Sequence, residues 1–346
     1  MERSNNFDAL RLIAATSVIF SHAFLLSEGR QDNEPLMAAT GGQAPLGVVG
    51  VFVFFIISGF LVTQSYEATG SALRYAAKRA LRIYPALAVC VLLCTFALGP
   101  FLTHDALGAY LRDAGTYDFL LNNLWLNTDQ NVLPGVGFSR FAFGAVVDGP
   151  LWTLPAEVAM YAMVLVLGLL GLLRLAVLVP LLAAGVVCLW LDTAASGWFI
   201  GTVSWLLAFF VAGMILYTLQ RLPIFSGRIA LLALAGLVAS VPLGCFIVLF
   251  PLCGGYLVIY LALERRLPVI PAARFGDLSY GLYIYGWPVE QTLVYLAGGA
   301  LAWWQLFPPA LAVSAALAFL SWHLIEKRAL HLKPRGVAAE GYAAPV

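Results

Sequence analysis

The chain has few charged residues: Asp, Glu, Lys and Arg make up 11% of its 346 positions, whereas about a quarter is usual in soluble domains. Hydrophobic residues make up 62%, and the mean hydropathy is +0.89. The net charge of +1 gives no electrostatic basis for binding nucleic acid. This composition excludes an ordinary soluble domain and predicts an integral membrane protein.

The five cysteines are scattered through apolar runs and show no metal-ligand spacing. We therefore expect buried free thiols and no metal site. No internal repeat is evident, and no stretch outside the apolar segments is long enough to fold alone. The sequence predicts one domain over residues 1–335 and a disordered tail over residues 336–346.

Apolar stretches of about twenty residues are long enough to cross a bilayer. Ten candidates are residues 7–26, 46–65, 81–100, 151–170, 172–191, 197–219, 228–243, 244–263, 279–298 and 303–324. Basic residues predominate in alternate loops, and the positive-inside rule then places both termini in the cytosol. The predicted fold class is an all-α polytopic membrane protein with about ten transmembrane helices.

Arg11 and His22 are unusual because both lie inside the first apolar segment. Eleven helical residues bring His22 back to within roughly 20° of Arg11, displaced by about 16 Å along the helix. Ionisable groups in a membrane are costly and indicate a functional site. The pattern suggests a cation that holds an anionic ligand and an imidazole that does proton chemistry further along.

Glu157 follows Trp152 at the start of the fourth segment. Helical rise places it roughly 9 Å below the outer boundary and His22 roughly 6 Å below it. An imidazole–carboxylate pair across two helices is therefore expected, in which the carboxylate orients the general base. The alternative is that both are independent polar packing residues.

The basic cluster Lys78, Arg79 and Arg82 leads into the third segment, and Arg82 would lie at a depth comparable to Arg11. Converging guanidinium groups can cradle phosphate, although a lipid-headgroup anchor explains the cluster equally well. Ser58 and Gly59 in the second segment could let a ligand approach the backbone, or could serve helix packing alone.

Aromatic and amide residues mark the outer side. Trp287 precedes Pro288, which predicts a kink in the ninth segment. Asn123 and Trp125, in the long external loop, suit stacking on a sugar ring and bonding to its hydroxyls, but an interfacial aromatic belt fits them too.

Six elements occur in one order along the chain. They are Arg11 with ten residues before His22, residues 55–60 (FIISGF), 79–85 (RALRIYP), 152–157 (WTLPAE) and 279–283 (SYGLY), and Trp322 with Glu326. In this the chain resembles the acyltransferase-3 family of membrane acyltransferases, which includes bacterial polysaccharide O-acetyltransferases. One departure is Gly286-Trp287, where many members have a histidine before the ninth-segment proline.

The resemblance implies an O-acyltransferase of the bacterial cytoplasmic membrane, with multiple spans. It would move an acyl group, usually acetyl, from cytosolic acyl-CoA to a hydroxyl of a cell-surface or lipid-linked glycan, with no bound cofactor. His22 would be the catalytic base, helped by Glu157 and Arg11. The donor would contact Arg79, Arg82, Lys78, Ser58, Gly59 and Tyr84. The acceptor side would comprise Trp152, Asn123, Trp125, Tyr283 and Trp287.

Two other functions fit parts of the sequence. A transporter of a glycan intermediate or small solute would also use many helices, a kink and intramembrane charges, and a non-catalytic scaffold would leave Arg11 and His22 without a role. The acceptor, the acyl length and the choice between direct transfer and an acyl-enzyme stay open. So does the oligomeric state, for which a homodimer is one alternative.

Overall fold

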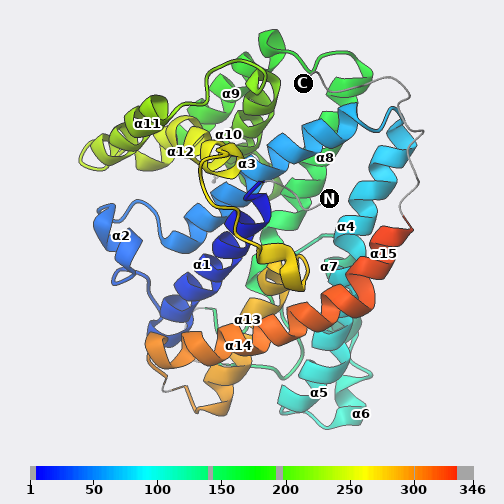
Figure 1. Cartoon of the computed structure of the whole chain (residues 1–346). Helices are drawn as coiled ribbons and strands as arrows, with labels where there is room; N and C mark the ends of the chain where they lie inside the picture. Colours follow the sequence, from blue (N-terminus) through cyan, green and yellow to red (C-terminus); the bar gives the residue numbers. More distant parts are fainter. Residues whose placement is uncertain (1–4, 139–142, 192–197, 300, 333–346) are drawn as a thin grey trace.

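A computed structural model of the chain describes residues 5–138, 143–191, 198–299 and 301–332 (Figure 1). These residues form helices joined by loops. The expected tail at 336–346 lies outside the described residues. The α-helices are α1 (Phe7–Glu28), α2 (Pro35–Ala39), α3 (Leu46–Glu67), α4 (Ala72–Leu93), α5 (Gly99–Leu102), α6 (Leu107–Tyr110), α7 (Ala114–Leu124), α8 (Leu154–Leu169), α9 (Leu175–Trp190), α10 (Trp198–Leu219), α11 (Gly227–Ser240), α12 (Phe246–Leu263), α13 (Ser279–Leu296), α14 (Trp303–Ser321) and α15 (Lys327–His331).

Four short segments of other helical types extend these elements. A π-helical segment, η1 (Cys94–Leu98), joins α4 to α5, and η5 (Trp322–Glu326) joins α14 to α15. The 3₁₀ segments η2 (Gly149–Thr153) and η4 (Ala272–Phe275) precede α8 and α13. The π segments make two long continuous helices, Ala72–Leu102 and Trp303–His331.

Among the described residues, seven helices are long and apolar enough to cross a membrane. The prediction of a polytopic helical membrane protein is therefore confirmed. The other three expected spans coincide with α9 and α11, which have 16 and 14 residues, and with α13, which carries polar side chains. The ten-span topology with cytosolic termini stays a prediction. Between the seventh and eighth expected segments the chain turns at Gly244, whose φ of 67° suits glycine.

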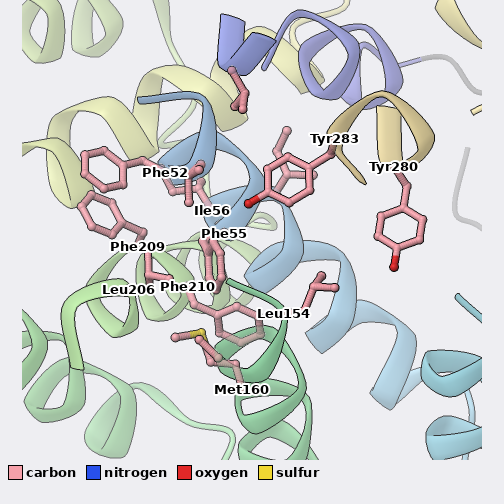
Figure 2. Packing of buried hydrophobic residues seen from close by; sticks show 14 of the residues in the cluster. Phe52, Phe55, Ile56, Leu154, Met160, Leu206, Phe209, Phe210, Tyr280 and Tyr283 are labelled. Atoms are coloured by element: carbon pink, nitrogen blue, oxygen red, sulfur yellow. The ribbon is translucent and has the colours of Figure 1, made fainter. Parts of the chain in front are cut away.

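The centre of the bundle is the crossing of α3 with α10. A Cβ atom on Gly59 would lie 1.9 Å from the carbonyl oxygen of Phe210, and one on Gly213 would lie 2.0 Å from that of Ile56. The two backbones can approach this closely because both helices have glycine there. Figure 2 shows Phe52 and Phe209 face to face beside this crossing, with ring centroids 3.7 Å apart.

Helix α13 carries several polar side chains, among them Glu290 and Gln291, and it is buried along most of its length. It packs between α1 and α14, while the pair α11–α12 lies on the opposite side of the bundle from α14–α15 (Figure 1). Burial on all faces explains how its polar residues avoid lipid. Helix α13 thus carries Asp277, at its start, and Glu290 into the interior of the protein.

Helix α4 begins where the Ser71 hydroxyl accepts a hydrogen bond from the Arg74 backbone amide at 3.5 Å, in the position of an N-cap. The basic residues therefore occupy its first turns, before the apolar run that continues past Pro85. This start places Arg79 and Arg82 at the same end of the bundle as Phe7 and Arg11.

Candidate active site

A cavity of about 1380 Å³ opens at the end of the bundle that holds the start of α1. Residues from many parts of the chain line it. They include Arg11 of α1, Phe54 and Ser58 of α3, Arg79 and Arg82 of α4, Glu157 and Tyr161 of α8, and Asp277, Tyr280 and Tyr283 around the start of α13. The structure thus brings together Arg11, Arg79, Arg82, Ser58 and Glu157, which are far apart in the sequence. We call this space the arginine cavity.

Asp277 links two of the arginines. Its Oδ2 atom lies 2.9 Å from Nη1 of Arg11 and 2.7 Å from Nη2 of Arg82, and its Oδ1 atom accepts a hydrogen bond from Ser279 at 2.6 Å. Burial favours a higher pKa for Asp277, but the two guanidinium groups and Ser279 outweigh it and hold the pKa below the usual range. Arg82 also lies 3.5 Å from Oε2 of Glu326.

Asp277 was missed in the sequence because it lies in a loop rather than in an apolar segment. The available signal was its position as the single acid between the arginines of residues 265–274 and the SYGLY motif. Glu326 belonged to the motif set, but nothing in the sequence indicated that it faces Arg82.

Arg79 makes no salt bridge with any described residue. Its Nη2 atom donates to Ser65 at 3.2 Å, and its guanidinium lies over the ring of Tyr161, 5.6 Å from the centroid. Among Arg11, Arg79 and Arg82, Arg79 is therefore the one whose charge is not paired with a carboxylate of the described residues.

A second cavity, of about 470 Å³, contains His22. Its lining includes Ser21, His22, Gln31, Asp129, Asn131, Trp152 and Trp287. Val51 and Tyr283 line both this histidine cavity and the arginine cavity. The two spaces therefore meet at a shared wall. Tyr283 is fixed there because its hydroxyl lies 2.7 Å from the Thr153 hydroxyl and donates to the Pro150 carbonyl at 3.0 Å.

The expected pair of His22 with Glu157 is wrong. Glu157 lines the arginine cavity, where its carboxylate accepts a hydrogen bond from the Tyr161 hydroxyl. The carboxylate that faces His22 belongs to Glu290, whose Oε2 atom lies 3.7 Å from Nδ1 of His22. Helical rise predicts similar depths for Glu157 and His22, but the two residues line different cavities.

Three of the expected donor residues lie elsewhere. Lys78 donates to the Thr69 hydroxyl at 2.9 Å and does not line the arginine cavity. Tyr84 is 37% exposed on α4, and Gly59 faces the backbone of α10. None of the three lines the arginine cavity, and a role for them in donor binding stays a prediction.

The expected acceptor residues divide into two groups. Trp152, Tyr283 and Trp287 line the histidine cavity, whereas Asn123 and Trp125 do not. The buried amide of Asn123 donates to the carbonyls of Phe119 and Gln130, and it thereby holds the loop after α7 against that helix. Trp125 is 82% exposed, which is consistent with an interfacial aromatic residue.

Buried Cys90, Cys94 and Asp148 place their ligand-type atoms within 4.8 Å of one another. The Cys90 thiol lies 3.6 Å from Oδ2 of Asp148 and 3.5 Å from the Ile284 carbonyl. These weak hydrogen bonds account for the contact without an ion, and the expectation of no metal stays a prediction.

The described residues thus form a polytopic helical bundle with one cavity lined by arginines and another that contains a histidine. Residues 4–323 match the family model of the acyltransferase domain, and the chain belongs to this family, acyltransferase 3. It is therefore a membrane-bound acyltransferase, which favours the enzyme over the transporter among the alternatives left by the sequence.

Curated relatives cover nearly the whole chain. An O-acetyl transferase of Shigella phage Sf6 is 29% identical over 349 residues, which are 95% of this chain and 97% of the relative. Nodulation protein 10 of Rhizobium leguminosarum bv. viciae is 31% identical over 364 aligned residues, covering 96% of this chain and 95% of the relative. No solved structure matches the chain.

Proposed function

We propose that this protein transfers an acyl group, in the simplest case acetyl, from cytosolic acyl-CoA to a hydroxyl of a cell-surface or lipid-linked glycan. The observation that carries the proposal is the shared wall of Val51 and Tyr283, with arginines on one side of it and His22 on the other. A donor held by its phosphates on one side can then present its thioester to an acceptor on the other.

The arginine cavity has the charge that an acyl-CoA requires. The donor's phosphates are anionic, and planar guanidinium groups match phosphate oxygens. Arg79 offers its charge most fully, whereas Arg11 and Arg82 share Asp277. The pantetheine arm would pass Phe54 and Ser58 towards Tyr283. The nucleotide then stays at the cytosolic end, and no cofactor beyond this co-substrate is needed.

In this proposal His22 acts as the general base. In the proposed step its imidazole removes the proton from the acceptor hydroxyl, and the oxygen attacks the thioester carbonyl. The C–S bond breaks, and the CoA thiolate takes the proton from the imidazolium. Trp152 and Trp287 give the cavity aromatic faces that suit a sugar ring. The relative named an O-acetyl transferase supports oxygen as the attacked atom.

The topology supports the same direction of transfer. If both termini are cytosolic, Arg11 lies near the cytosolic face and His22 about 16 Å further along α1. The protein would then be a multi-pass protein of the bacterial cytoplasmic membrane that acylates its acceptor on the outer side.

The test uses membrane vesicles containing the full-length chain and radiolabelled acetyl-CoA, followed by mass analysis of the glycans. A general base contributes about 10²–10⁴-fold, so His22→Gln should lower label incorporation by that factor. His104→Gln is the matched control, because His104 lies in the described loop after α5 and lines neither cavity. Wild-type rates in His22→Gln vesicles would contradict the proposal.

A further inference from the structure

Glu290 is a fully buried carboxylate on α13 that the proposed reaction has not yet used. Neither of its oxygens has a hydrogen-bond partner among the described residues, and the same holds for Nδ1 of His22. The two unpaired groups face each other at 3.7 Å. Buried polar groups normally have partners, so this pair of exceptions requires an explanation.

The close approach of helices α1 and α13 brings these two side chains together. Helices α1 and α13 approach closely at Gly286, where a Cβ atom would lie 2.9 Å from Cγ1 of Ile19. His22 follows Ile19 by three residues and Glu290 follows Gly286 by four, so each lies about one helical turn further on. A methyl group at position 286 would require the Ile19 side chain to move or the helices to separate, and separation would take the imidazole away from the carboxylate.

The neighbours of Glu290 have different partners. Gln291 donates to the carbonyls of Phe143 and Val146 at 2.7 and 3.1 Å. The Trp287 indole donates to Val146 at 2.9 Å, and its ring meets that of His22 edge to face, with centroids 4.8 Å apart. Trp287 therefore limits the movement of the imidazole on one side, and Glu290 faces its Nδ1 atom.

We propose that Glu290 is the positioning residue of His22: it accepts the Nδ1 proton, fixes the tautomer, and leaves Nε2 free to take the proton of the acceptor hydroxyl. The proposal depends on the proposed role of His22. A distance of 3.7 Å exceeds a hydrogen bond, but such contacts are often long without substrate and tighten in the reacting complex. The carboxylate would balance the charge of the imidazolium and would not itself exchange a proton.

The first experiment compares Glu290→Leu with the wild-type protein. Leucine has a similar volume, and replacing a buried charge by an apolar residue is often neutral or stabilising. We expect the melting temperature to equal or exceed that of the wild type, while kcat for acetyl transfer falls roughly 10²-fold and KM for acetyl-CoA is unchanged. A residue kept for packing would show the opposite pattern, with lost stability and retained kcat.

Glu34→Leu is the matched control for removing a buried carboxylate. Glu34 is also fully buried, but it accepts hydrogen bonds from the backbone amides of Met37 and Leu46 at 2.7 and 3.2 Å. This variant should melt at a lower temperature and keep its kcat. Glu290→Asp, which retains the charge at a shorter reach, should recover part of the kcat lost in Glu290→Leu.

The second experiment needs no acceptor. Diethyl pyrocarbonate acylates an unprotonated imidazole nitrogen, and mass spectrometry of the purified protein gives the rate at His22 with His104 as internal reference. Glu290→Gln should slow modification of His22 several-fold relative to His104. Equal rates at His22 in both proteins would overturn the positioning role even if acetyl transfer is found. Absence of acetyl transfer by the wild type would contradict the proposed function. The comparison of modification rates at His22 would still test whether Glu290 positions the imidazole.

Discussion

Arg11 and Arg82 donate to the same carboxylate oxygen, Oδ2 of Asp277, at 2.9 and 2.7 Å, although they belong to α1 and α4. One anion thus holds two cations that would otherwise repel each other. It also ties the first turns of α1 and α4 to the start of α13. The arrangement keeps both guanidinium groups at the arginine cavity while leaving Arg79 without a carboxylate partner among the described residues.

The first prediction concerns Asp277→Asn. The variant leaves two nearly buried guanidinium groups without their shared anion, and breaking such a pair costs about 3–5 kcal/mol. We expect a lower melting temperature and a higher KM for acetyl-CoA. Thermal unfolding in detergent and steady-state kinetics measure these effects. Wild-type values for both would show that the three side chains do not interact in the membrane.

The pH dependence of this effect has a definite sign. A carboxylate with a depressed pKa stabilises the folded state at pH values above its unfolded pKa, about 3.9, and loses this contribution only as the pH falls through the lower folded value. The difference in stability between wild type and Asp277→Asn should therefore stay constant from pH 8 to about pH 5. A difference that shrinks across this interval would mean that Asp277 takes up a proton there.

The second prediction separates two adjacent basic residues. Arg79→Ala removes a cation of the arginine cavity that has no carboxylate partner among the described residues. It should raise KM for acetyl-CoA about tenfold or more, because a charge-assisted hydrogen bond contributes about 1.5–3 kcal/mol. Lys78→Ala should leave KM unchanged, since Lys78 binds Thr69 away from the cavity. Equal effects of the two variants would indicate a diffuse surface field instead of a binding site.

Lys78 also shows what the sequence could not provide. Lys78 and Arg82 are four residues apart, so helical spacing places them on one face, yet Arg79 and Arg82 line the cavity and Lys78 does not. Lys78 instead donates to Thr69. Spacing predicts which residues can share a face, but the direction of a flexible side chain depends on the partners that the fold supplies.

The carboxylate partner of His22 could not be predicted from the sequence, for a different reason. Helical rise gave His22 and Glu157 matching depths, but depth does not say which helices are neighbours or how each is rotated. Helix α13 packs on α1 and brings Glu290 to His22. Glu157 instead accepts a hydrogen bond from Tyr161, one turn further along its own helix, α8. In the sequence, Glu290 is an ionisable residue two positions after Pro288, inside the expected ninth segment. Only the packing of the bundle assigns it to the imidazole.

The third prediction tests the shared wall. Val51→Phe adds a ring to a side chain that borders both cavities and is 6% exposed. We expect it to obstruct passage of the acyl end, so that binding of acetyl-CoA is retained while transfer is lost. Equilibrium binding of labelled acetyl-CoA, together with the vesicle assay, distinguishes these steps. Undiminished transfer by a folded Val51→Phe protein would mean that the acyl group takes another route.

The fourth prediction concerns the crossing of α3 and α10. Gly59→Ala would place a methyl group 1.9 Å from the carbonyl oxygen of Phe210, and Gly213→Ala would place one 2.0 Å from that of Ile56. The neighbouring atoms are backbone, so the helices must separate, and overpacking of this kind costs about 1–3 kcal/mol or more. We expect either variant to lower the melting temperature by several degrees, whereas Gly108→Ala, with nothing within 4 Å of the added atom, should not. A Gly59→Ala protein as stable as Gly108→Ala would contradict the close crossing of α3 and α10. If that stable protein also failed to bind acetyl-CoA, the result would support the expected role of Gly59 at the donor site.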